Sequence, residues 1–182
     1  GNPLTDLTAE EVKTDWLLIT HGHSDHIGDM IPIAKENQAT IISIVEIADY
    51  ANSRGVDSFG MNIGGKHAFP FGVVKFVHAQ HSSSYEVDGI VQYMGEPSGI
   101  IIQAEGKTIY HAGDTAYFSD LGLLAEEFDI DVAFLPIGDN YTMGPEDAAK
   151  AAQTIRAKKV VPIHYNTFPV IEQDPESFVE LL

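Results

Sequence analysis

The hydrophobic positions of the chain fall into short apolar runs that alternate with amphipathic segments. Apolar runs of about four to eight residues favour buried strands, whereas apolar residues spaced three or four apart favour helices. These patterns predict strands at 15–20, 39–44, 73–79, 99–104, 107–111, 130–137 and 160–163. They predict helices at 27–37, 45–54, 115–128 and 145–155. The stretch 59–72, rich in glycine and aromatic residues, is predicted to be a loop.

Strands that alternate with helices, together with a hairpin at Glu105-Gly106, indicate a layered α/β fold. The helix that begins at Pro145 is the clearest of these elements, because proline suits the first helical position. The length of 182 residues suits one domain, residues 1–182, and a hydrophobic content of 44% is enough for a packed core.

Charge and composition exclude several classes of partner. The net charge is −17, and no cluster of lysine and arginine is present to displace counterions from a nucleic acid, so no nucleic-acid partner is expected. No apolar run is long enough to span a bilayer, so no membrane partner is expected. The absence of cysteine rules out disulfides and thiolate ligands and fits a cytoplasmic location.

Four candidate metal ligands stand within six residues, directly after the first predicted strand, in the sequence His21-Gly22-His23-Ser24-Asp25-His26. Histidine and aspartate suit zinc, iron or manganese. The alternative is a polar surface turn that happens to be rich in histidine. Later residues favour the metal site, because His81, Asp114 and His164 also follow predicted strands, and ligands bind at that edge of open α/β sheets.

The candidate ligands are sufficient for two metal ions. They are five histidines and two aspartates: His21, His23, His26, His81, His164, Asp25 and Asp114. Two ions about 3.5–4 Å apart can share a bridging hydroxide, and the pKa of metal-bound water falls to about 7. Such a hydroxide would attack a carbonyl or phosphoryl centre, so no serine nucleophile is needed. The serines at 82–84 are then expected to hydrogen-bond local groups.

The same residues resemble those of the metallo-β-lactamase superfamily. The match consists of His21-x-His23-x-Asp25-His26, a later His81, Gly113-Asp114-Thr115 and a late His164. Further segments resemble a family of metal-dependent hydrolases related to L-ascorbate-6-phosphate lactonase. They are Tyr110-His111-Ala112-Gly113-Asp114-Thr115, Leu135-Pro136-Ile137-Gly138-Asp139-Asn140, Thr142-Met143-Gly144-Pro145 and Pro162-Ile163-His164-Tyr165.

The resemblance implies a four-layer αββα sandwich and two divalent cations, with zinc favoured over manganese, iron or nickel. It implies that His21, His23 and His81 bind one ion, that Asp25, His26 and His164 bind the second, and that Asp114 bridges them. Asp25 is also expected to orient water or accept a proton. His111, beside the Asp114 turn, is expected to support the site or contact substrate.

The resemblance also bears on the two ends of the chain. The family usually begins with a hairpin before the segment that starts at Gly1 and continues into a strand after Leu182. We therefore expect a piece of a longer protein, with a sandwich that lacks its N-terminal hairpin and C-terminal strand. Exposed strand edges can pair with another chain, so such a chain could form a homo-oligomer.

The sequence predicts a dinuclear metal-dependent hydrolase that acts on a small-molecule lactone, ester or phosphate ester. One alternative is a non-hydrolytic di-iron redox protein of the same fold. Another is a regulatory module that binds metal without turnover, because ligands alone do not establish activity.

Overall fold

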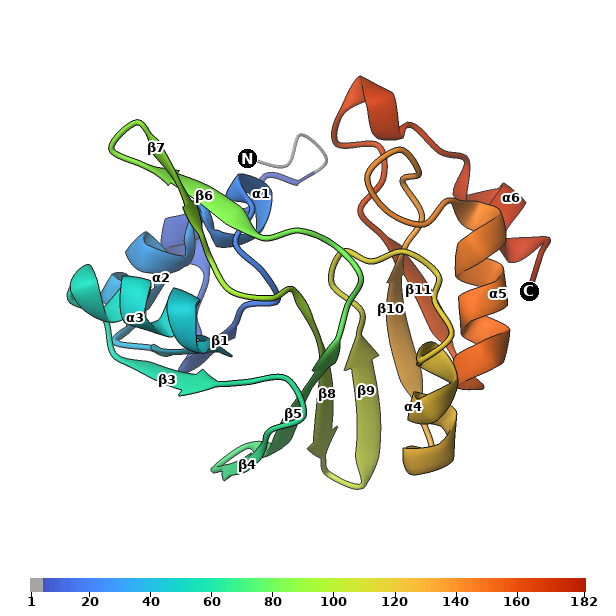
Figure 1. The fold of residues 1–182 in the computed structure, drawn as a ribbon, viewed down its shortest axis with the longest axis horizontal. Helices are drawn as coiled ribbons and strands as arrows, with labels where there is room; N and C mark the ends of the chain where they lie inside the picture. Colours follow the sequence, from blue (N-terminus) through green and yellow to red (C-terminus); the bar gives the residue numbers. More distant parts are fainter. Residues whose placement is uncertain (1–4) are drawn as a thin grey trace.

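Two sheets form the centre of the computed structural model, which describes residues 5–182 (Figure 1). The smaller sheet is parallel, in the order β1-β2-β3, with β1 (Trp16–Leu18), β2 (Thr40–Ile44) and β3 (Ser58–Met61). The larger sheet has the order β11-β10-β9-β8-β5-β4. Its strands are β4 (Lys66–Phe69), β5 (Gly72–His78), β8 (Ser98–Ala104), β9 (Lys107–His111), β10 (Val132–Pro136) and β11 (Val160–Ile163).

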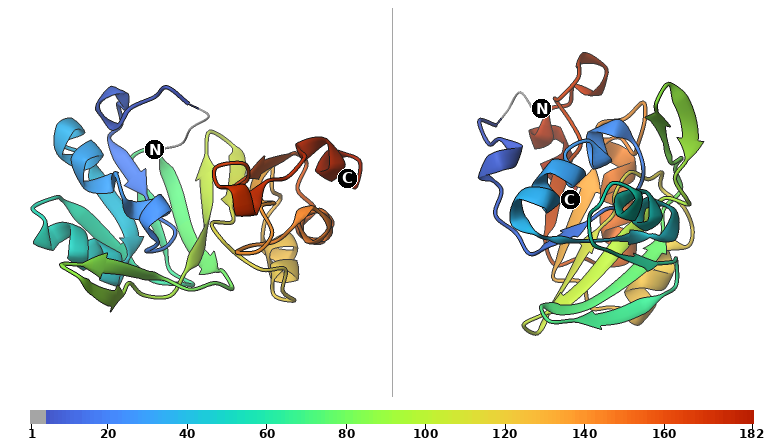
Figure 2. Two further views of the ribbon diagram at one scale, coloured as in Figure 1. Left: turned by 90° about the horizontal axis from the view of Figure 1, so that it is seen from above. Right: turned by 90° about the vertical axis from the view of Figure 1, so that its left-hand side faces the viewer.

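Helices cover the outer face of each sheet (Figures 1 and 2). The N-terminal half contributes the 3₁₀ helix η1 (Ala9–Glu11) and the helices α1 (Ser24–Ile27), α2 (Met30–Asn37) and α3 (Val45–Ser53). The C-terminal half contributes α4 (Leu121–Glu127), α5 (Pro145–Ile155), η2 (Pro169–Ile171) and α6 (Pro175–Val179). None of the helices in residues 5–182 is long and apolar enough to cross a membrane.

Three separate hydrophobic clusters fill the spaces between the layers. Ile41 of β2 packs with α2 and α3, whereas its neighbour Ile42 faces Phe76 of the larger sheet. This is the alternation that a strand imposes on successive side chains. On the far side, Leu135 of β10 packs against α4 and α5. The layers are therefore helix, sheet, sheet and helix, and the predicted αββα sandwich is confirmed.

The directions of the strands place the candidate ligands at one edge. Strand β8 runs antiparallel to both β5 and β9, so β5 and β9 point the same way, and β10 and β11 are parallel to β9. The carboxyl ends of β5, β9 and β11 consequently meet at one edge of the larger sheet. His81, Asp114 and His164 follow these three ends.

Most predicted elements are present, but one prediction is wrong and one helix is shorter than the segment predicted to carry it. The stretch 59–72 is not a loop, since it contains most of β3 and all of β4, whose polar and glycine-containing sequences form strands only by pairing with β2 and β5. The segment 115–128 carries the predicted helix, but this helix begins only at Leu121. Thr115 and Ala116 instead form hydrogen bonds with the backbone of Gln80, which keeps this part of the chain out of a helix.

A hairpin at 84–93 forms a third, separate sheet that the hydrophobic pattern did not predict. It consists of β6 (Ser84–Val87) and β7 (Ile90–Tyr93), joined by Asp88-Gly89. Both turn residues have positive φ, at 52° and 79°, as two-residue hairpin turns require. The Asp-Gly pair is therefore the sequence signal that identifies this hairpin.

We expect Leu135→Ala to lower the free energy of unfolding by about 2–5 kcal/mol, because it leaves a cavity between the larger sheet and α4–α5. Urea unfolding would measure this change. The matched control is Leu123→Ala on α4, whose side chain is exposed and should shift stability by no more than about 0.5 kcal/mol. Equal effects at the two positions would contradict the assignment of this core.

Candidate metal centre

Five stretches of chain converge on one group of side chains at the shared sheet edge. The loop after β1 supplies His21 and His23, and α1 supplies Asp25 and His26. The loops after β5, β9 and β11 supply the remaining three, His81, Asp114 and His164. The structure thus brings together all seven residues that the sequence suggested as metal ligands. Their role as ligands remains a prediction.

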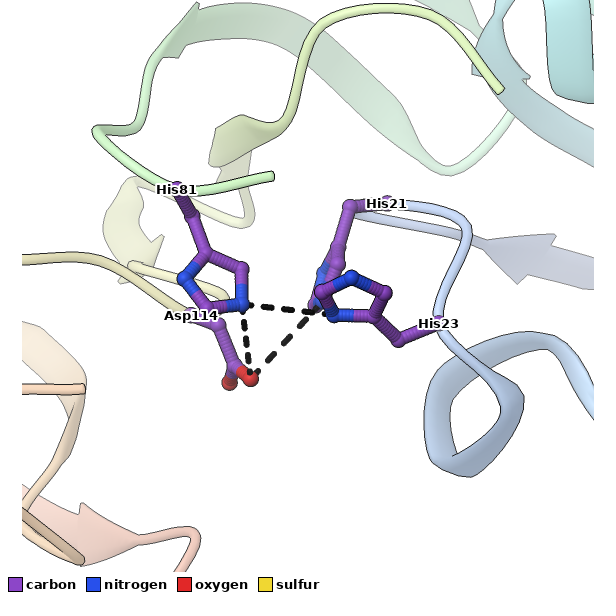
Figure 3. Close-up of side chains that lie close together, drawn as sticks. All are labelled: His21, His23, His81 and Asp114. Carbon is purple, nitrogen blue, oxygen red and sulfur yellow. Dashed lines mark hydrogen bonds and ion pairs between the residues drawn. The ribbon is translucent and has the colours of Figure 1, made fainter. Parts of the chain in front are cut away.

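The first group consists of His21, His23, His81 and Asp114 (Figure 3). His21 Nε2 lies 3.0 Å from His23 Nδ1, which lies 3.3 Å from His81 Nε2. Asp114 Oδ2 lies 3.7 Å from the His21 nitrogen and 3.6 Å from the His81 nitrogen. Three ring nitrogens and one carboxylate oxygen therefore point toward a common centre.

The second group consists of Asp25, His26 and His164, beside the same Asp114 oxygen. Asp25 Oδ2 lies 3.4 Å from the Nε2 atoms of both His26 and His164. Asp114 Oδ2 lies 3.3 Å from His26 Nε2 and 3.2 Å from His164 Nε2. One oxygen of Asp114 is thus shared by both groups.

These distances fit metal coordination. Tetrahedral bonds of about 2.0–2.1 Å place neighbouring ligand atoms about 3.3 Å apart, close to the separations within both groups. Three buried atoms of the site, His26 Nε2, Asp114 Oδ1 and His164 Nδ1, have no hydrogen bond to any described residue. Buried polar atoms normally have partners, and a cation beside Asp114 would satisfy part of this set.

Without a cation, the histidines divide into two kinds. Burial, together with the charge of the neighbouring His26, lowers the pKa of His21 to about 3, so its ring is neutral. Burial also lowers the pKa values of His23 and His81. For His26, burial opposes the charge, but the carboxylates of Asp114 and Asp25 prevail and raise its pKa to about 9.

The second group behaves as a network of ion pairs when it is free of metal. His164 resembles His26, because the same two carboxylates outweigh burial and raise its pKa to about 10. In return, His164 and His26 hold the pKa of Asp25 well below its usual range. Burial would raise the pKa of Asp114, but the same two histidines lower it. Protons on His26 and His164 therefore balance the carboxylates that a cation would otherwise balance.

Local contacts fix the orientation of the first two histidines. Thr20 Oγ1 lies 3.0 Å from His21 Nδ1, which leaves Nε2 to face the cluster. Gly22 donates its N–H to Ser83 Oγ at 3.0 Å, and a side chain at Gly22 would collide with Met94. The expectation that the serines hydrogen-bond local groups is met here, and the predicted strand-end loop needs glycine because of this close approach.

The turns that carry Asp114 and His164 have unusual backbones. Gly113 has φ 63°, and an added Cβ would lie 2.9 Å from Thr20 Cβ. His164 has φ 55°, which is uncommon for a residue other than glycine and is found mostly where the surroundings enforce it. Gly138 packs directly against the His164 carbonyl, so a side chain there would displace this turn.

His111 is not placed with the seven other candidates. Its Nδ1 accepts the N–H of Gly113 at 3.1 Å, and its ring stacks on Phe134. Burial lowers the pKa of His111, so the ring is neutral and can accept this hydrogen bond. The position suits a residue that holds the Gly113-Asp114 turn, and a direct role for His111 in catalysis stays a prediction.

A cavity of about 560 Å³ opens beside the cluster. Of the seven residues, its lining includes His23, Asp25, His81, Asp114 and His164. The rest of the lining comes from residues that were not predicted as metal ligands or catalytic groups: Ser24, Ser82, Ser84, Tyr85, Glu86, Tyr141 and Phe168. Three of these, Ser84, Tyr85 and Glu86, belong to strand β6 of the separate hairpin. The site therefore has room for a small molecule in front of the candidate ligands.

Comparisons with known proteins identify the class to which this fold and site belong. The family described as the β-lactamase superfamily domain matches residues 2–165. The chain therefore belongs to the metallo-β-lactamase superfamily. It is 63% identical over 180 residues to the UPF0173 metal-dependent hydrolase of Enterococcus faecalis, across 99% of this chain and 80% of that protein. The corresponding hydrolase of Anoxybacillus flavithermus is 60% identical over 183 residues, which cover 100% of this chain and 81% of that protein.

Solved structures agree with this assignment. Igni18, a metallo hydrolase from the archaeon Ignicoccus hospitalis, is 40% identical with a TM-score of 0.88, covering 98% of this chain and 77% of that one. An isothiocyanate hydrolase from Delia radicum gut bacteria shares the fold, with a TM-score of 0.74 and 21% identity. The match covers 99% of this chain and 74% of that one. The protein is accordingly a metal-dependent hydrolase of this superfamily.

We expect Zn²⁺ to displace about two protons from the ligands at pH 7.5, because ligands must be deprotonated and the pKa values of His26 and His164 lie above this pH. A metal-bound water with a pKa of about 7 would release up to about one proton more. Affinity should fall as the pH decreases, since further ligands then become protonated. Calorimetric titration in two buffers of different ionisation enthalpy would count the protons. Zn²⁺ binding to the His164→Ala variant should release about one proton fewer. Zn²⁺ binding without any proton release would contradict these charge states.

Proposed function

We propose that this protein is a dinuclear hydrolase that acts on a small lactone, ester or phosphate ester. The observation that carries the proposal is the position of Asp114 Oδ2, within 3.2–3.7 Å of ring nitrogens from both groups. A carboxylate oxygen in that position suits a bridge between two cations. Each group then supplies three further ligand residues, which is typical of catalytic zinc sites.

The two proposed sites have different protein ligands. His21, His23 and His81 would hold one cation, and Asp25, His26 and His164 the other. Zinc is favoured by the tetrahedral spacing and by the imidazole-rich ligand set, although manganese, iron and nickel accept similar ligands. Two bound cations would supply a water molecule of lowered pKa and stabilise the developing oxyanion.

The side chains of the protein position the substrate and move the proton. Asp25 is partly exposed and lines the cavity, so its carboxylate can reach a reacting water as well as its neighbours in the cluster. We assign Asp25 the role of orienting this water or accepting its proton, as a general base requires contact distance. Ser82 Oγ lies 3.3 Å from His23 Nε2 and helps to orient this ring.

The metal content of variants tests the two-site arrangement. We expect Asp114→Ala to weaken the binding of both ions by at least about 10-fold, because the shared ligand is lost. His164→Ala should lower mainly the occupancy of one ion. Elemental analysis after dialysis against a weak chelator would measure both. Asp88→Asn, at the tip of the hairpin, is the matched control for loss of a carboxylate, and two tightly held ions in Asp114→Ala would refute the bridge.

Activity is tested on the same preparation whose metal content is known. We expect the protein purified without added metal to hydrolyse at least one substrate from a panel of lactones, carboxylic esters and phosphate esters. Chelation should abolish the activity, and a divalent cation should restore it. Hydrolysis that continues after complete removal of metal would exclude the proposal. Bound iron with redox-active absorbance, and no hydrolysis, would favour a redox protein instead.

A further inference from the structure

The cavity beside the metal centre contains no basic side chain. All ten lysine and arginine residues lie within the described range 5–182, and none of them lines the cavity. The charged side chains on its wall are instead carboxylates and histidines of the metal centre, together with the exposed carboxylate of Glu86 on β6. Sites that bind phosphate or carboxylate groups usually provide arginine or lysine. This cavity offers an anionic substrate no counterion beyond the metal centre itself.

Two of the lysines form ion pairs away from the cavity. Lys75 pairs with Glu127 at 2.6 Å, and Lys158 lies between Asp129 and Asp131, at 2.8 and 3.2 Å. These pairs join α4 and the start of β10 to their neighbours, on the part of the larger sheet opposite the metal edge. Lys75 and Lys158 therefore pair with carboxylates of their own surroundings and do not line the cavity.

Aromatic side chains supply much of the remaining wall. Tyr141, in the loop between β10 and α5, is 57% exposed, and Phe168, before η2, is 43% exposed. On the side of the hairpin, Tyr85 lines the cavity and packs edge-on against Tyr50, with 5.9 Å between the centres of the two rings. Aromatic rings give a large apolar contact surface, and ligand pockets are typically lined in this way. The walls therefore suit an apolar substituent.

We propose that the cavity selects neutral substrates with an apolar substituent, namely carboxylic esters or lactones, and discriminates against phosphate esters and other anions. The proposal rests on the hydrolase function proposed above and narrows its substrate class. Glu86 repels anions at the wall of the cavity, and Tyr141 and Phe168 bind the apolar part. Cations held by the cluster would contact the reacting carbonyl, so specificity is assigned to side chains outside the cluster.

The test compares substrates that share one leaving group and differ in charge: 4-nitrophenyl butyrate, 4-nitrophenyl hemisuccinate and 4-nitrophenyl phosphate. For the metal-loaded protein we expect kcat/KM for the butyrate to exceed that for the hemisuccinate by about 10-fold or more, because like charges repel in the cavity. The phosphate should be the poorest of the three. Added salt should narrow the gap between butyrate and hemisuccinate, because salt screens this repulsion.

Variants assign the selectivity to particular residues. Glu86→Gln should raise the ratio of hemisuccinate to butyrate kcat/KM several-fold, and Phe168→Ala should raise KM for the butyrate more than it lowers kcat. Asp88→Asn removes a carboxylate from the same hairpin outside the cavity and should leave the ratio unchanged.

Two outcomes would distinguish a failure of the proposed selectivity from a failure of the proposed hydrolase function. Hydrolysis that favours the phosphate or hemisuccinate, or a ratio unchanged by Glu86→Gln, overturns the selectivity while the hydrolase function stands. A metal-loaded protein that hydrolyses none of the three esters and no lactone overturns the proposed hydrolase function and the selectivity with it.

Discussion

The buried carboxylate of Asp114 is the group on which the rest of the site depends. Its side chain is almost fully removed from solvent, and a buried charge is costly unless it is paired. Four histidines approach one of its oxygens, from the loop after β1, from α1 and from the loops after β5 and β11. Compensation of this charge therefore requires that both sheets be in place at the same time.

The two sheets are joined directly beside this carboxylate. Ser98, at the start of β8, donates both its N–H and its hydroxyl to the carbonyl of Thr20, at 3.0 and 2.9 Å. Thr20 in turn contacts the ring of His21 and limits the space at Gly113. Contacts that hold the sandwich together are thus the same contacts that position the first histidine and the Asp114 turn. Stability of the fold and geometry of the site are consequently coupled here.

The part of the site that would bind the substrate is built differently. Its walls come from the hairpin β6–β7 and from the loops that contain Tyr141 and Phe168, outside the contacts around Asp114. Loops on a rigid scaffold can change in sequence without disturbing the ligands, which is how one fold accommodates different substrates. Membership of the superfamily therefore identifies a metal-dependent hydrolase, whereas the substrate selectivity that we propose depends on the side chains of these walls.

The sequence by itself determined the layered fold and the seven residues that meet in the cluster. Apolar runs predicted most strands, Pro145 predicted the start of α5, and the positions of histidine and aspartate after the strands predicted all seven residues of the cluster. These features are local, because they depend on periodicity, on capping preferences and on the chemistry of histidine and aspartate.

Only the tertiary structure decided which distant segments pair and which side chains line the cavity together. Strands β3 and β4 form because neighbours supply their hydrogen bonds, and the chain leaves its predicted helix at Thr115 because Gln80 competes for the backbone. Likewise, no local pattern relates Glu86 to Tyr141 or Phe168, which lie far apart in sequence and meet around one cavity. Pairing and burial between distant segments are properties of the packed chain, and they cannot be found in any short window of sequence.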